Sequence, residues 1–137
     1  MDQPLALVLF SGTDDKLQSA AVMTAGAAAV GRPVHIFLQY WALDAFRSDR
    51  ITKDHGLSAE AGPSGHAAVE ALRNAGQEPW YETLRQAKDL GEVEIQACSL
   101  SMDLLEIQES DLDPLVDGVE GVTAFWMAAA EGPVVFI

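Results

Sequence analysis

The chain has 137 residues, 49% of them hydrophobic, which suits one compact domain over 1–137 with a full apolar core and excludes a wholly disordered chain. Its formal net charge of -13 argues against nucleic acid and anionic membranes as partners. With one cysteine, no signal-peptide leader and no apolar run near the ~20 residues of a membrane span, we expect a cytoplasmic, soluble protein.

The first part of the chain predicts two buried strands around a helix. Residues 4–10 (PLALVLF) and 33–40 (PVHIFLQY) are apolar without alternation, as in strands covered on both faces. Between them, residues 14–30 predict an alanine-rich helix that ends at Gly31. This helix is apolar nearly all round, which indicates close packing on a sheet. Residues 40–46 are expected as a loop.

The middle of the chain is less regular. Residues 47–66 mix charged residues with Gly, Ser and Pro and predict a mobile surface loop. A modest helix is expected over 66–77. Residues 79–91 predict a stronger helix, with Pro79 at its first position, Gly91 after its end and an apolar stripe. The stripe consists of Trp80, Leu84 and Ala87.

The last part predicts three strands and two short helices. Residues 92–98 (EVEIQAC) alternate, as in a half-exposed strand near a sheet edge, and a short helix should follow up to Ile107. Residues 121–125 and 133–137 predict two more strands, and 124–131 a helix between them. Alternating strands and helices predict a layered α/β fold with a mostly parallel sheet.

Cys98 is the candidate reactive residue, because ligands of parallel sheets meet the loops after the carboxyl ends of the strands. Backbone amides at the helix start, with the hydroxyls of Ser99 and Ser101, are groups that stabilise a thiolate, whereas Asp103 opposes it. Cysteine is also among the most often buried residues, so a packing role is equally open. Gly12, Lys16 and Trp41, on neighbouring loops, are candidates for a pocket wall.

Other motifs carry less. Residues 26–33 (GAAAVGRP) have the glycine spacing of a phosphate loop but lack its Lys and Ser/Thr. In residues 11–16 (SGTDDK), two aspartates oppose an anion and favour helix capping. The three histidines have no ligand spacing, so no metal or cofactor is expected. Without a second cysteine, thiol–disulfide cycling is disfavoured, which leaves persulfide transfer or peroxide reduction with an external thiol.

Three stretches resemble the DsrE/DsrF-like family, and within it the sulfur-transfer-associated members often labelled peroxiredoxin-like. They are residues 11–46, 96–107 (QACSLSMDLLEI) and 115–125 (LVDGVEGVTAF), and the resemblance leaves out about residues 47–78. It implies a three-layer α/β/α fold with a parallel five-stranded sheet, of flavodoxin-like architecture, and homo-oligomers, commonly trimers or hexamers. The chain lacks the methionine-rich basic insert of many relatives and a second cysteine.

The resemblance also implies roles for single residues. Cys98 matches the cysteine that carries sulfur as a persulfide, and the residues around it match Ser99, Ser101, Met102 and Asp103. The first hypothesis is therefore a sulfur carrier or sulfurtransferase-like protein that relays sulfane sulfur between a donor and an acceptor protein. The alternative is a non-catalytic oligomeric module that binds a small ligand or a protein, with Cys98 as packing. A thiol peroxidase is the third hypothesis.

Overall fold

The structure is a computed structural model, and it describes residues 3–137. The first half of the chain contains β1 (Leu5–Leu9), α1 (Asp14–Ala29), β2 (Val34–Leu38), α2 (Tyr40–Ala45), the 3-10 helix η1 (Ala59–Ala61) and α3 (Gly62–Asn74). The second half contains α4 (Trp80–Leu90), β3 (Val93–Cys98), α5 (Ser99–Leu105), the 3-10 helix η2 (Glu109–Asp111), β4 (Gly118–Glu120), α6 (Val122–Ala129) and β5 (Val134–Phe136).

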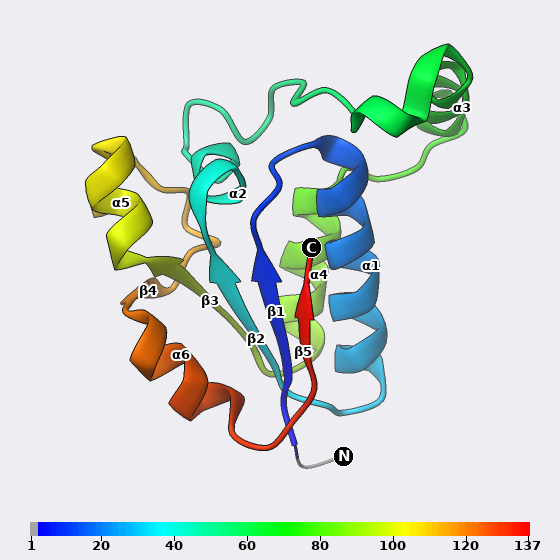
Figure 1. Ribbon diagram of the computed structural model, residues 1–137. Coiled ribbons are helices and arrows are strands. Elements are labelled where there is room, and N and C mark those ends of the chain that lie inside the picture. Colours follow the sequence, from blue (N-terminus) through cyan, green and yellow to red (C-terminus); the bar gives the residue numbers. More distant parts are fainter. Residues whose placement is uncertain (1–2) are drawn as a thin grey trace.

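The five strands form one parallel sheet in the order β4-β3-β2-β1-β5. Helices α1 and α4 lie against one face of this sheet, and α6 lies against the other (Figure 1). The predicted three-layer α/β/α fold with a parallel five-stranded sheet is therefore confirmed. All residues of β1 and β2 are buried, as their unbroken apolar runs predicted.

The two faces of the sheet are covered unequally. On one face, strand residues such as Leu7, Ile36 and Ile95 join the large core that includes Leu17 of α1 and Leu84 of α4. We call this the α1–α4 face. The opposite face, which we call the α6 face, has a separate small cluster of buried residues: Ala6, Val8, Phe37, Cys98, Phe125 and Ala129. Helix α6 therefore buries two residues, whereas α1 buries six and α4 buries three.

Most of the predicted helices are present, with shifted ends. Helix α4 buries the predicted stripe of Trp80, Leu84 and Ala87, although Pro79 precedes the helix as its N-cap residue. Helix α1 ends one residue before the expected end, and Gly31 has the positive φ of 79° that favours glycine after a helix. No helix within residues 3–137 is long and apolar enough to cross a membrane.

Three expectations were wrong. Residues 121–125 are not a strand: the strand is β4, and Gly121 is the N-cap of α6, because Phe125 and Ala129 pack on the sheet at helical spacing. Residues 40–46, expected as a loop, contain helix α2. The expected loop 47–66 already contains the first turn of α3, which begins at Gly62.

Segment 47–61 is fastened to the body of the protein at several points. Arg47 forms an isolated bridge with Leu112, and Ile51 is buried. The backbone N–H of His55 donates to Asp14 Oδ2 (3.0 Å), and Ser58 N–H donates to Asp15. The segment therefore lies over the amino end of α1.

Gly12 provides a test of the packing between the loop after β1 and α2. A Cβ atom at Gly12 would lie 2.3 Å from the backbone oxygen of Trp41, which cannot move without shifting α2. We expect Gly12→Ala to lower the free energy of unfolding by about 2–3 kcal/mol, as overpacking does. Urea denaturation followed by circular dichroism measures this loss.

Gly26 is the matched control for this substitution. It lies within α1, and a Cβ atom there would meet nothing within 4 Å. We expect Gly26→Ala to raise the stability by about 0.5–1 kcal/mol through helix propensity. Equal effects of the two substitutions would contradict the close approach at Gly12.

Candidate functional site

Cys98 lies where two helices begin side by side. It is the last residue of β3 and the N-cap residue of α5. In the neighbouring strand it is paired with Glu120, and the next residue, Gly121, is the N-cap of α6. A Cβ atom at Gly121 would lie 3.8 Å from Ser99 Oγ, so the two helix starts are close neighbours. Unpaired backbone N–H groups of both first turns are thus near the cysteine.

The thiol is almost closed off from solvent in the single chain. Cys98 is 4% exposed and packs in the cluster of the α6 face with Phe37 and Phe125. The rings of these two phenylalanines stack with centroids 4.9 Å apart. Access to the sulfur therefore depends on α6, which carries Phe125.

The four residues after Cys98 that the family resemblance singles out have different surroundings. Ser99 is half-buried beside Gly121, and Asp103 is exposed on α5. Met102 is buried in the core of the α1–α4 face and does not belong to the small cluster of Cys98. Ser101 is fully buried.

Ser101 has a structural contact that the sequence did not reveal. Its hydroxyl oxygen accepts a hydrogen bond from the backbone N–H of Tyr40 (3.1 Å). Tyr40 has a φ of 45°, in the left-handed region that a tyrosine rarely adopts. The contact fastens α5 to the start of α2, next to the carboxyl end of β2.

The predicted pocket residues are not all brought together. Trp41 is 56% exposed on α2, which packs beside α5. Gly12 contacts the backbone of Trp41 and allows this close approach. Lys16 is exposed on α1, which covers the α1–α4 face, whereas Cys98 lies on the α6 face. The structure therefore separates Lys16 from Cys98 by the sheet.

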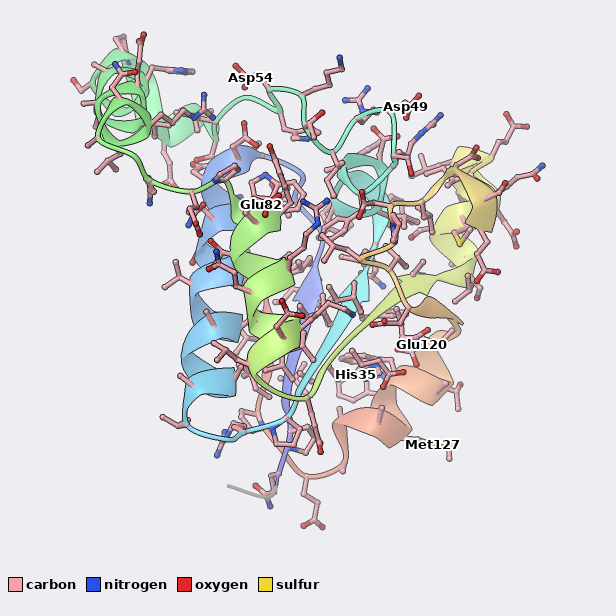
Figure 2. All side chains as sticks on the ribbon, turned by 180° about the vertical axis from the view of Figure 1, so that it is seen from behind. His35, Asp49, Asp54, Glu82, Glu120 and Met127 are labelled. Atoms are coloured by element: carbon pink, nitrogen blue, oxygen red, sulfur yellow. The ribbon has the colours of Figure 1, made fainter. Side chains whose placement is uncertain are left out.

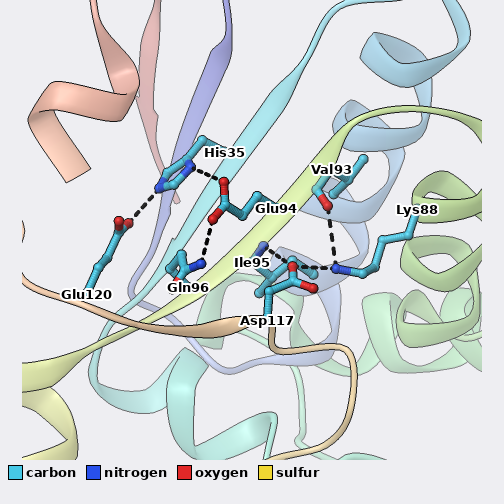
Figure 3. A network of polar contacts seen from close by, with 8 residues as sticks. All are labelled: His35, Lys88, Val93, Glu94, Ile95, Gln96, Asp117 and Glu120. Atoms are coloured by element: carbon cyan, nitrogen blue, oxygen red, sulfur yellow. Dashed lines mark hydrogen bonds and ion pairs between the residues drawn. The ribbon is translucent and has the colours of Figure 1, made fainter. Parts of the chain in front are cut away.

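A buried histidine network supports the strand next to Cys98 (Figure 3). His35 Nε2 lies 2.5 Å from Glu120 Oε1, and Nδ1 lies 3.6 Å from Glu94 Oε2. The doubly protonated ring can donate toward both carboxylates, whereas the neutral ring donates toward one. Figure 2 shows His35 and Glu120 side by side near α6. Local sequence pattern does not predict this contact, because 85 positions separate the two residues.

A second network holds the segment before β4. Asp117 Oδ2 accepts hydrogen bonds from the backbone N–H of Ile95 (2.7 Å) and from Lys88 Nζ (2.5 Å). Lys88 also donates to the backbone oxygen of Val93 (3.4 Å). Figure 3 shows the His35 network on one side of β3 and the Asp117 network on the other. Together they fix the three-residue strand β4 and therefore the start of α6. Within residues 3–137, no three His, Cys, Asp or Glu side chains are placed to hold a metal ion.

Residues 1–78 match the sequence profile of the DsrE/DsrF/DrsH-like family, more than half of the chain. The chain is also 31% identical over 151 residues to the uncharacterized protein YrkE of Bacillus subtilis strain 168, covering 93% of this chain and 92% of that protein. The chain belongs to the DsrE/DsrF/DrsH-like family.

Solved structures support the same fold. MTH1491 of Methanobacterium thermoautotrophicum, a protein of unknown function, superposes with a TM-score of 0.60 at 15% identity and covers 99% of this chain and 100% of that chain. YchN of Escherichia coli superposes with a TM-score of 0.57 at 15% identity over 100% of both chains. At these identities the likeness shows the fold alone.

The family match differs from the expected resemblance in its extent. The resemblance expected from the sequence leaves out about residues 47–78, whereas the DsrE/DsrF/DrsH-like profile extends through residue 78. It ends before β3, so it does not include Cys98. The role of Cys98 therefore depends on the local geometry and not on the profile.

His35 provides a test of the network next to Cys98. The side chain of Glu120 is only 12% exposed, and His35→Leu removes the partner of its carboxylate. We expect a loss of about 3 kcal/mol in the free energy of unfolding, since an unpaired buried charge is strongly destabilising. Adding Glu120→Leu should restore most of the loss, because both polar partners are then replaced. Urea denaturation of both variants measures the effect.

Glu94 is the control within the same network. Its side chain is 56% exposed and stays accessible to water. We expect Glu94→Gln to change the stability by less than about 1 kcal/mol. If the double variant His35→Leu with Glu120→Leu is as unstable as His35→Leu alone, the ion pair is not the source of the loss.

Proposed function

We propose that this protein is a sulfur carrier that accepts sulfane sulfur on Cys98 as a persulfide and passes it to a partner thiol. The DsrE/DsrF/DrsH-like family is associated with sulfur relay, which supports this chemistry over others. The observation that carries the proposal is the position of Cys98 at the carboxyl ends of two neighbouring strands, where α5 and α6 both begin.

The proposed transfer uses a charged sulfur, and the two helix starts supply backbone N–H groups near it. A helix amino terminus stabilises a nearby negative charge by about 0.3–1 kcal/mol at an exposed site and by more where it is partly buried. Two such starts flank Cys98. Glu120, the paired residue on β4, would oppose a thiolate, but His35 lies against its carboxylate. The histidine therefore reduces the repulsion that the strand neighbour would exert.

The transfer is a simple exchange of sulfur–sulfur bonds. The Cys98 thiolate attacks the terminal sulfur of a polysulfide or of thiosulfate, and the new bond joins Sγ to that sulfur. The donor's sulfur–sulfur bond breaks, and the shortened polysulfide or sulfite leaves with the electron pair. A partner thiolate then attacks the terminal sulfur of the persulfide and releases the Cys98 thiolate. No oxidant or second cysteine in this chain is needed.

Access to Cys98 requires a movement of α6. The helix is held on the sheet through two buried side chains, Phe125 and Ala129, while Trp126 and Met127 on its outer side are exposed. An element with so few buried contacts opens locally without unfolding of the core. In this proposal, displacement of α6 admits the donor.

We also propose that the protein is a homo-oligomer, a trimer or hexamer, that associates through the α6 side. Six large apolar side chains of α5, α6 and β5 are each more than half exposed: Leu100, Leu104, Val122, Trp126, Met127 and Phe136. Exposed apolar patches of this kind mark interaction surfaces. A chain with a net charge of -13 repels its copies elsewhere, so association depends on this apolar side.

Sulfur loading tests the carrier function. After incubation with polysulfide at neutral pH, we expect the intact mass of the wild type to rise by whole sulfur atoms. Cys98→Ser should stay unchanged. A low-molecular-weight thiol should then remove the added sulfur, because the terminal persulfide sulfur is transferred to it. Intact-protein mass spectrometry measures both steps.

Phe125→Ala distinguishes a closed thiol from an inert one. Removal of the ring opens the cluster around Cys98, so alkylation by iodoacetamide should accelerate, by roughly tenfold for about 1.4 kcal/mol less closing free energy. Sulfur loading should accelerate with it. If the wild type and Phe125→Ala are both folded and neither takes up sulfur, the carrier proposal is wrong and the non-catalytic binding module is favoured.

The oligomeric state is tested by light scattering after size-exclusion chromatography. Trp126→Glu with Met127→Glu places charges on the apolar side and should lower the measured mass to that of the monomer. The control is Leu90→Glu, because Leu90 is 69% exposed on α4 and lies away from α6. A monomeric wild type, or dissociation by both substitutions, would contradict the α6-side interface.

A further inference from the structure

A cavity of about 480 Å³, which Cys98 does not line, lies between the amino end of α1, the segment before η1, helix α3 and the start of α4. Figure 2 shows Asp54, one of its lining residues, and Met127 of α6 toward opposite ends of the molecule. Its volume is in the range of pockets that hold small organic molecules. Neither the family match nor the proposed sulfur chemistry gives this cavity a role.

One wall of the cavity is a helix without packing of its own. Helix α3 stands away from the three layers (Figure 1), and none of its 13 residues is buried. Its apolar side chains Val69 and Leu72 line the cavity together with Leu57, Pro79 and Tyr81. Isolated helices of this length are marginal in water, and most helical stability comes from burying an apolar side. An occupant with an apolar body would bury that side.

The base of the cavity is a buried carboxylate. Asp14 is 8% exposed, and its Oδ1 accepts a hydrogen bond from the indole N–H of Trp80 (3.0 Å). Its Oδ2 accepts one from His55 N–H and lies 3.4 Å from Arg73 Nη2. These contacts connect Trp80, segment 47–61 and α3 around the cavity.

The lining has an excess of negative charge. Four carboxylates, those of Asp14, Asp15, Asp54 and Glu78, face two cationic groups, those of Lys53 and Arg73. The amino end of α1 would otherwise attract an anion, but two of these carboxylates occupy its first turn. The charge therefore favours a cation.

Two of these carboxylates are held in the ionised form. Burial raises the pKa of Asp15, but hydrogen bonds from Ser58 and Thr13 outweigh it and leave the pKa below its ordinary value. The backbone N–H of Gly56 lowers the pKa of Asp54. Both groups stay charged at neutral pH. A metal ion does not fit, because within residues 3–137 no three ligating side chains converge.

We propose that this cavity binds a small organic cation with an apolar body, such as an arylalkyl amine. The ammonium group would lie near the carboxylates, and the body would lie against Leu57, Val69 and Leu72. The concave shape, with walls from four segments, suits a small molecule better than a strand or helix of another chain. The inference is independent of the sulfur carrier function.

Binding is tested with 2-phenylethylamine as the probe, followed through the indole N–H signal of Trp80 in two-dimensional NMR. We expect a saturable shift of this signal with a Kd below about 1 mM. The signal of Trp126, on the far side of the sheet, should not move. 3-Phenylpropionate, which has the same ring with a negative charge, and ethylamine, which lacks the ring, should bind at least about tenfold more weakly.

Variants locate the site. Leu72→Ser removes part of the apolar wall and should weaken binding about tenfold, and Asp54→Asn about two- to fivefold. The matched control is Glu70→Gln, on the same helix but outside the cavity lining, and it should bind as the wild type does.

Three outcomes would overturn the proposal. The first is the absence of a saturable Trp80 shift at millimolar probe. The second is equal binding of 3-phenylpropionate. The third is a change in oligomeric mass on Leu72→Ser without probe binding, since the cavity would then be filled by a second copy of the chain.

Discussion

The unequal covering of the two sheet faces governs the rest of the structure. One face is closed by two long helices that share a large core, whereas the other is closed by an eight-residue helix through Phe125 and Ala129. Full burial of one large apolar side chain stabilises by about 1.5–3 kcal/mol, so α6 is displaced at a small fraction of the free energy needed to move α1. Cys98 lies on the thinly covered face and is closed in the chain as described, and the proposed carrier function requires that movement of α6 exposes it. The same asymmetry leaves the outer side of α6 exposed, and the proposed homo-oligomer would associate there.

Strand β4 pairs with β3 beside Cys98 and leads directly into α6, so its position determines where α6 begins relative to the cysteine. With three residues, it has few ladder hydrogen bonds of its own, and polar side chains supply the rest. Asp117 is tied to β3 and Lys88, and Glu120 is tied to His35. Ile95 of β3 and His35 of β2 lie nearer the centre of the sheet, and all residues of β2 are buried, whereas Lys88 lies on α4. The start of α6 is therefore fixed by polar contacts, whereas Ala129 packs its last turn on the sheet.

The sequence predicted those parts of the fold that local pattern determines. β1 and β2 are apolar throughout because both faces are covered, and α4 shows its buried stripe at helical spacing. The run around 121–125 was misjudged because a short apolar stretch fits a buried strand and a buried helix equally well. Lys16 was placed beside Cys98 because their loops end at one sheet edge. Alternation along a strand shows that there are two faces, but not which helix covers each. The His35–Glu120 contact depends on strand order, which local pattern does not contain.

Asp14 shows how a correct local prediction can hide a larger role. Its place in the first turn of α1 predicted a favourable charge at a helix start, and this holds. Yet its two oxygens accept hydrogen bonds from residues 41 and 66 positions away, in the loop and in α4. The parallel connection from β2 to β3 needs only one crossover helix, and α4 supplies it, so the excursion through η1 and α3 is not required to build the sheet. That excursion is held by the acidic first turn of α1 and shapes the cavity beneath α3. The segment is fastened by Asp14, which is buried, and by Asp15, which is partly exposed, and in our proposal its role is to form the wall of the cation site.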